Sequence, residues 1–200
     1  MRKILLCIFA LFLSACSFSQ KEINPPSVKF ILNSDELLAT ETLTQTRFKI
    51  KILMPQSPLY LQSNQIYYLK KNELNSYAFH MWESPLTMSY YSFMTHKLQN
   101  SGIFEAVINK NSLISPDYIL ESRMDNFEQV FDDNDNFVWL KMSVSLIRAQ
   151  DKTLLGQRFF DYRTEVDNQN IQSVVAAFDK TLNSLSNDLV VWISELLKKE

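Results

Sequence analysis

Cys16 is the residue in this sequence whose type and position most clearly indicate chemistry. It ends the tetrapeptide Leu13-Ser14-Ala15-Cys16, in which small residues directly precede the cysteine. This spacing is typical of a lipobox, where a lipoprotein signal peptidase cleaves ahead of the cysteine. We therefore expect Cys16 to be lipidated and to become the mature N-terminus. A diacylglyceryl cysteine carries at least two acyl chains, and each buried CH₂ contributes about 0.8 kcal/mol, so the predicted anchor is durable.

The segment ahead of Cys16 has the composition of an export signal. Arg2 and Lys3 are positive, and residues 4–13 are continuously apolar. That run is shorter than the roughly 20 apolar residues of a membrane-spanning helix. Residues 1–15 are therefore predicted to be a signal peptide, the alternative being an ordinary secretory signal with a chance cysteine. Cys7 lies inside this segment, so the predicted mature chain has no thiol for a disulfide or a nucleophile.

Residues 16–27 are predicted to be a lipidated N-terminus and a flexible tether. The segment is polar and ends in Pro25-Pro26, a composition that favours an extended chain over a packed core. At about 3.3 Å per residue it could reach on the order of 35 Å from the membrane. Ser17 follows the cysteine where aspartate would retain many Gram-negative lipoproteins in the inner membrane. The periplasmic face of the outer membrane is therefore the expected location.

The acidic run at 132–136 (Asp-Asp-Asn-Asp-Asn) superficially suggests a calcium loop. An EF-hand loop needs glycine at position six and a bidentate glutamate at position twelve. Counted from Asp132, those positions hold Phe137 and Ser143. Because aspartate and asparagine also supply turn conformations, the run is predicted to be a turn between two strands.

The two histidines, His80 and His96, are the remaining candidates for catalysis. His80 falls on a predicted strand and His96 on a polar stretch of a predicted helix, so structural or surface roles are expected for both. A serine triad would need one of them as its base, but the sequence has no GxSxG elbow. With only two glycines it has no phosphate-binding loop, and a net charge of −2 argues against a nucleic-acid partner. We expect no catalytic residue, no cofactor, no metal site and no enzymatic activity.

The elements that would position these residues begin with short strands and one helix. Strands are predicted at residues 28–32, 48–53 and 104–108, and a hairpin at 65–70 and 76–82 around a turn at 71–75. Residues 33–46 are expected to be a polar loop, or to hold a short helix at 36–40. Ser84-Pro85 is predicted to begin a helix, with Ser84 as its cap, that stops at Asn100-Ser101-Gly102.

The second half of the chain has the clearest periodicity. A strand is predicted from apolar residues at period two, namely Val138, Leu140, Met142, Val144 and Leu146. Turns at 132–136 and 150–152 predict partner strands at 118–131 and 153–164, which gives an antiparallel meander. A 3.5-residue seam then predicts a helix of about 39 Å over 171–196, lying either on its own sheet or in a coiled coil. The predicted class is α+β, an antiparallel or mixed sheet with two main helices on one face, as a single domain over 28–200.

Taken in order, these features resemble the ABC-type transport auxiliary lipoproteins, the PqiC-like family that accompanies MCE-type lipid transport systems. The matching segments span nearly the whole predicted mature chain. They are Cys16, Met54-Pro55, Tyr60-Leu61, Ile66-Tyr67-Tyr68, Trp82-Glu83-Ser84-Pro85, Leu98, residues 101–107, residues 117–121, Phe127-Glu128, Phe159-Phe160, Ala176-Ala177-Phe178 and Trp192-Ile193.

The resemblance implies a fold similar to the TolB N-terminal type and a non-enzymatic outer-membrane lipoprotein. Such a protein would dock against the periplasmic MCE subunit of a lipid-transporting ABC system. An oligomeric ring, if formed, would give the helical seam or the sheet edges a partner. The alternative is a structural or assembly lipoprotein of the envelope, of the kind that helps place lipopolysaccharide or pili. A periplasmic hydrolase would need a nucleophile, base or metal cluster that the sequence does not indicate.

Overall fold

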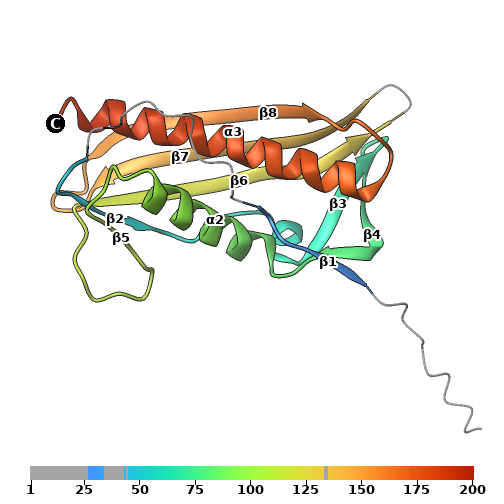
Figure 1. Ribbon diagram of the computed structural model, residues 1–200, viewed down its shortest axis with the longest axis horizontal. Helices are drawn as coiled ribbons and strands as arrows, with labels where there is room; N and C mark the ends of the chain where they lie inside the picture. Colours follow the sequence, from blue (N-terminus) through green and yellow to red (C-terminus); the bar gives the residue numbers. More distant parts are fainter. Residues whose placement is uncertain (1–26, 34–42, 44, 133–134) are drawn as a thin grey trace, which may run out of the picture.

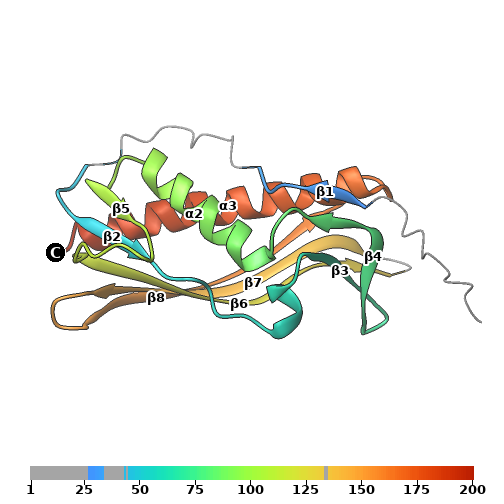
Figure 2. The ribbon, with the colours of Figure 1, turned by 90° about the horizontal axis from the view of Figure 1, so that it is seen from below.

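The computed structural model describes residues 27–33, 43, 45–132 and 135–200, so the predicted loop at 33–46 lies largely outside the described residues. A mixed eight-stranded sheet forms one layer, and both main helices lie on one of its faces (Figures 1 and 2). The predicted α+β class is confirmed. In chain order the elements are β1 (Val28–Phe30), β2 (Lys49–Ile52), the 3-10 turn η1 (Leu59–Gln62), β3 (Gln65–Lys70), β4 (Glu73–Trp82), α2 (Leu86–Asn100), β5 (Ala106–Ile108), β6 (Tyr118–Phe131), β7 (Asn136–Arg148), β8 (Leu154–Glu165) and α3 (Ile171–Leu197).

Strands β6, β7 and β8 form the antiparallel meander that the alternating pattern predicts. Tyr118 pairs with Arg148 at one end of the β6–β7 ladder and Phe131 with Asn136 at the other. The alternating apolar side chains of β7 are all buried beneath the helices. This alternation fixes the register, because a slip of one residue would expose the whole set.

On its other side, β6 pairs with two separate groups of strands. Its first residues pair in parallel with β2, which pairs in parallel with β5. Its last residues pair in parallel with β3, which continues to β4 and then to β1. Between these groups the β6–β7 register shifts at Asp125, between Met124 and Asn126. Such a bulge changes which alternate side chains face the helices.

The hairpin of β3 and β4 turns more tightly than predicted. Lys71 and Asn72 both have positive φ, 50° and 64°, which is the conformation of a two-residue hairpin turn. Strand β4 therefore begins at Glu73, and the predicted turn at 71–75 was too long. The reason is that two residues with positive φ match the twist of the flanking strands, so no longer loop is needed.

The start of α2 differs from the prediction. Pro85 is the N-cap and makes no side-chain cap hydrogen bond, while the Ser84 hydroxyl donates to the Glu83 carboxylate. Ser84 as a capping residue was therefore wrong, because a carboxylate on the preceding residue competes for its hydroxyl. The helix ends as predicted, with Gly102 at φ 67° directly after it.

Helix α3 lies along β7 and β8 and buries its apolar seam against its own sheet, which favours that alternative over a coiled coil. The Asn170 side chain accepts a hydrogen bond from the Ser173 amide and caps its first turn. Phe178 contacts the rings of Trp82 and Phe127 edge-on, at 5.2 and 4.8 Å, and so joins the helix to the sheet. Among the described residues, no helix is long and apolar enough to cross a membrane.

Candidate binding pocket at the hairpin end of the sheet

The residues that the sequence singles out do not come together in one site. Cys16 lies outside the described residues, as do two positions of the acidic run. His80 on β4 contacts the rings of Phe30 and Tyr77, at 6.0 and 6.3 Å, and His96 is exposed on α2. Within the described part of the chain, no cluster of three or more His, Cys, Asp or Glu side chains could hold a metal ion.

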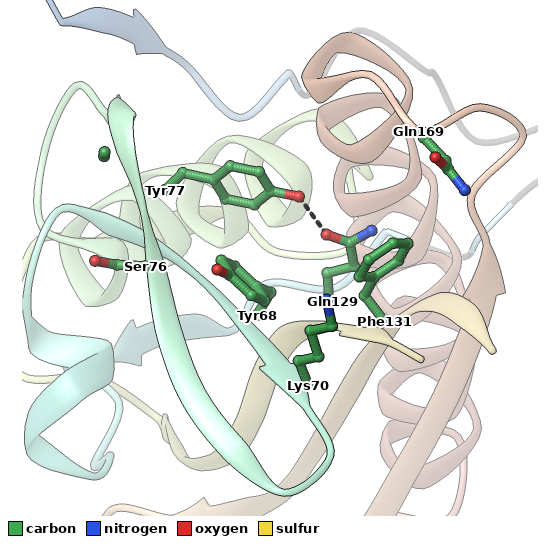
Figure 3. A pocket seen from close by; sticks show the side chains of 8 residues that line it. Tyr68, Lys70, Ser76, Tyr77, Gln129, Phe131 and Gln169 are labelled. Atoms are coloured by element: carbon green, nitrogen blue, oxygen red, sulfur yellow. Dashed lines mark hydrogen bonds between the residues drawn. The ribbon is translucent and has the colours of Figure 1, made fainter. Parts of the chain in front are cut away.

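A pocket of about 390 Å³ lies between the β3–β4 hairpin, the end of β6 and the segment that leads into α3 (Figure 3). Its described lining is mostly aromatic and uncharged polar, with one lysine. Tyr68, Lys70, Ser76, Tyr77 and Ala78 come from the hairpin, Gln129 and Phe131 from β6, and Gln169 from the segment before α3. A volume in the range of about 300 to 1,000 Å³ with few polar groups is typical of small-molecule sites.

An irregularity in β4 forms one wall of this pocket. Gln65 pairs with Met81 but Tyr67 already pairs with Ser76, so β4 contains extra residues between these two pairs. Extra residues bend a strand away from its partner and redirect its side chains. Tyr77 lies in this bend, and its ring contacts that of Tyr68 at 5.1 Å between centroids. The bend thereby turns the Tyr77 hydroxyl toward β6, as Figure 3 shows.

A chain of hydrogen bonds runs from Tyr77 into the protein. The Tyr77 hydroxyl donates to Gln129 Oε1, and Gln129 Nε2 donates to Asn136 Oδ1 at 2.6 Å. Asn136 Nδ2 donates in turn to the carbonyl oxygen of Val166 at 3.3 Å. Because a backbone carbonyl can only accept, this last bond fixes the orientation of both amides and makes Tyr77 the donor.

The groups left toward the cavity are mainly donors. Lys70 lies at the rim with its ammonium 5.5 Å from the centre of the Phe131 ring, and it forms no ion pair with a described residue. The side-chain hydroxyl of Tyr68 has no hydrogen-bond partner among the described residues, whereas the Ser76 hydroxyl points to the other side of β4 from Tyr77, as Figure 3 shows. Burial, with the neighbouring Tyr68, raises the pKa of Tyr77, so its phenol remains protonated as the donor.

A second polar cluster lies on the opposite face of β6, because successive side chains of a strand alternate. Glu128 is fully buried and accepts from the Tyr60 hydroxyl at 2.9 Å, the Asn126 amide at 2.6 Å and the Phe127 backbone amide at 2.8 Å. Burial raises the pKa of this carboxyl, while the three hydrogen bonds oppose the rise. The carboxylate is satisfied by neutral donors, which identifies it as a structural group beneath η1.

Sequence reasoning did not find the pocket. Tyr68 and Glu128 entered only through the family resemblance, and Gln129 was missed. The sequence did contain one signal, the adjacent polar residues Glu128 and Gln129 within a long predicted strand. Two such residues can both be buried only if each has hydrogen-bond partners on its own face of the sheet, so the pair indicates a polar cluster on each face.

Solved structures share this fold. The protein XCC0632 from Xanthomonas campestris superposes with a TM-score of 0.72 at 20% identity, over 87% of this chain and 95% of that chain. The hypothetical protein CT253 from Chlamydia trachomatis matches with a TM-score of 0.57 at 8% identity, over 78% of this chain and all of that one. At these identities the likeness concerns the fold alone. The search of curated proteins gives no match.

The fold and the pocket together define a small α+β protein with a polar-aromatic cleft at the hairpin end of its sheet. The family comparison is more specific, because the model of the ABC-type transport auxiliary lipoprotein component matches residues 30–190. This chain belongs to that family, as the resemblance predicted. Membership makes it a lipoprotein component that assists an ABC-type transporter, and it associates the chain with the cell envelope.

Proposed function

We propose that this chain is an outer-membrane lipoprotein that binds the periplasmic MCE subunit of an ABC-type lipid transporter and acts by binding, without catalysis. The observation that carries the proposal is the family match over residues 30–190, and the predicted lipobox that ends at Cys16 supports it. Residues 1–15 would be removed, and residues 16–27 would tether the domain that begins at residue 28.

Two exposed apolar side chains at the end of the domain far from β1 offer a contact for a partner. Strand β1, where the described chain begins, lies at one end of the long axis, and the loop between β5 and β6 lies at the other (Figure 1). In that loop Leu113 is fully exposed and Ile114 is 56% exposed. Neighbouring apolar side chains that are open to solvent gain free energy when a partner covers them. A domain held at one membrane would present this loop toward the periplasm.

A site-specific cross-linking experiment tests the proposal in the native envelope. A photoreactive residue is placed at Leu113 and, as a control, at Lys141, which is exposed on β7. We expect ultraviolet light to join an MCE protein to the Leu113 variant and to leave the Lys141 variant uncoupled. Recovery of only peptidoglycan or outer-membrane assembly factors would contradict the proposal and favour a structural or assembly lipoprotein. Coupling through Lys141 alone would still identify an MCE partner, but it would place the contact on the face of the sheet that the helices do not cover.

A further inference from the structure

We infer that the pocket between the β3–β4 hairpin and β6 binds the anionic phosphodiester headgroup of a lipid, with Lys70 opposite the phosphate. This inference rests on the proposed function for the choice of a lipid, but its chemistry comes from the pocket. The lining contains one cation, and no carboxylate is found among the described residues that form it. A cavity lined by one cation and several hydrogen-bond donors favours an anion with several acceptor oxygens.

The hydrogen-bond chain from Tyr77 to Val166 explains why Gln129 has a donor, and no acceptor, left for a ligand in the pocket. Its orientation is fixed by the Val166 carbonyl, so the oxygens of Gln129 and Asn136 are already occupied within the protein. The second Nε2 hydrogen of Gln129 stays available, because this amide nitrogen carries two hydrogens and donates only one of them to Asn136. The hydroxyl of Tyr68 and the ammonium of Lys70 add two further donors that no described acceptor satisfies.

The size and the apolar surfaces of the pocket favour an organic phosphate over a free ion. A volume of about 390 Å³ is far more than a bare phosphate would fill. The rings of Tyr68 and Phe131 provide apolar surface beside the donors, as Figure 3 shows. A glycerol backbone and the first carbons of its acyl chains would cover this surface, while the phosphate meets the donors.

The test measures lipid binding to the full chain, purified in a non-ionic detergent, by native mass spectrometry. The probes are dihexanoyl phosphatidylglycerol, dihexanoylglycerol, which has the chains without the phosphate, and inorganic phosphate. We expect phosphatidylglycerol to bind more tightly than either of the others. If dihexanoylglycerol bound as tightly as phosphatidylglycerol, the pocket would not recognise the anionic group. If inorganic phosphate bound as tightly, the pocket would not recognise a lipid. A failure of all three probes to bind would overturn the inference.

Variants connect the binding to the named side chains. Lys70→Gln should weaken phosphatidylglycerol binding by about tenfold or more, since hydrogen bonds to charged groups are the strongest of this kind. Tyr68→Phe should weaken it by roughly threefold to tenfold and leave the melting temperature unchanged, because that hydroxyl has no described partner to lose. Lys141→Gln is the matched control and should bind like the wild type. Unchanged binding by Lys70→Gln would overturn the inference, whereas the MCE cross-link tests the proposed function independently.

Discussion

Two adjacent residues of β6 show how burial gives neighbouring polar groups different roles. Glu128 is 0% exposed and Gln129 is 2% exposed, yet they face opposite sides of the sheet. The Glu128 carboxylate accepts hydrogen bonds from three donors, so its acceptor groups are satisfied within the protein. Gln129 accepts a hydrogen bond from the Tyr77 hydroxyl, donates one to Asn136 and borders the pocket. The strand thus supports a structural cluster on one face and a binding cleft on the other.

The first prediction concerns the pH dependence of stability through Glu128. Burial raises the pKa of its carboxyl above the ordinary value near 4.5, so the folded protein binds this proton more tightly than the unfolded chain. Stability from this group is therefore fully present below the unfolded-state pKa and is lost as the pH rises through the folded-state pKa. Glu128→Gln should remove that loss, so the variant gains stability relative to wild type as the pH rises from 4 to 7.

Chemical unfolding of both proteins across that pH range measures the difference. Glu121→Gln is the control, because Glu121 is exposed on the same strand. We expect the control to follow the wild type at every pH. A Glu128→Gln variant whose relative stability fell with rising pH would show that the ionised carboxylate stabilises the fold.

The second prediction at this scale concerns Cys16. Replacing it with serine should abolish lipidation, so the protein should lose its membrane association and appear in the soluble periplasmic fraction. Ser17→Asp should instead leave the anchor in place and move the protein toward the inner membrane. Density-gradient fractionation of the two membranes measures both outcomes. A Cys16→Ser protein that stayed with the membrane would mean that another segment holds it there.

At the scale of elements, the end of α2 depends on backbone conformation and not on packing. Gly102 has φ 67°, and a Cβ built there would meet no atom within 4 Å. Gly102→Ala should therefore lower the free energy of unfolding by about 1 kcal/mol through left-handed strain alone. Gly102→Asn should cost less, because asparagine tolerates this conformation. Denaturant titration measures both, and an alanine variant as stable as wild type would contradict this account.

The elements also show what the sequence could and could not predict. The β6–β7–β8 meander and α3 were predicted closely because their pairing is local and their periodicity is strong. The parallel pairing of β6 with both β2 and β3 was not predicted, since it joins segments far apart in the chain with no turn between them. The pocket was missed for the same reason. Tyr77, Gln129 and Gln169 come from three separate segments, and no local pattern links them.

At the scale of the whole molecule, β8 leaves the sheet with an open side. Among the described strands it pairs with β7 alone, although it is twelve residues long. A long unpaired edge presents backbone donors and acceptors that another chain can use. We propose that a second copy of this chain binds there and that repetition of the contact forms a ring. Phe159, which is 76% exposed on this strand, would lie within the contact.

The prediction for this edge is a change in oligomer mass. Phe159→Glu should reduce the mass of the full chain in detergent to that of a monomer, because a buried unpaired charge is costly at an interface. Leu59→Glu is the matched control, since Leu59 is 82% exposed in η1 and belongs to no strand. Light scattering measures both variants. A wild-type chain that stays monomeric at high concentration would contradict the ring.

The pairing of β1 with β4 has a consequence for how strongly the pocket needs to bind. Val28 pairs with His80, two residues from the part of β4 that lines the pocket. A tether that leaves from Val28 would confine the cleft to a thin shell above the bilayer, where lipid headgroups reach a high effective concentration. In that shell, a millimolar dissociation constant for a lipid headgroup would already give substantial occupancy of the pocket. Weak binding also means rapid release, so a lipid could pass to the next carrier within the lifetime of an ordinary encounter.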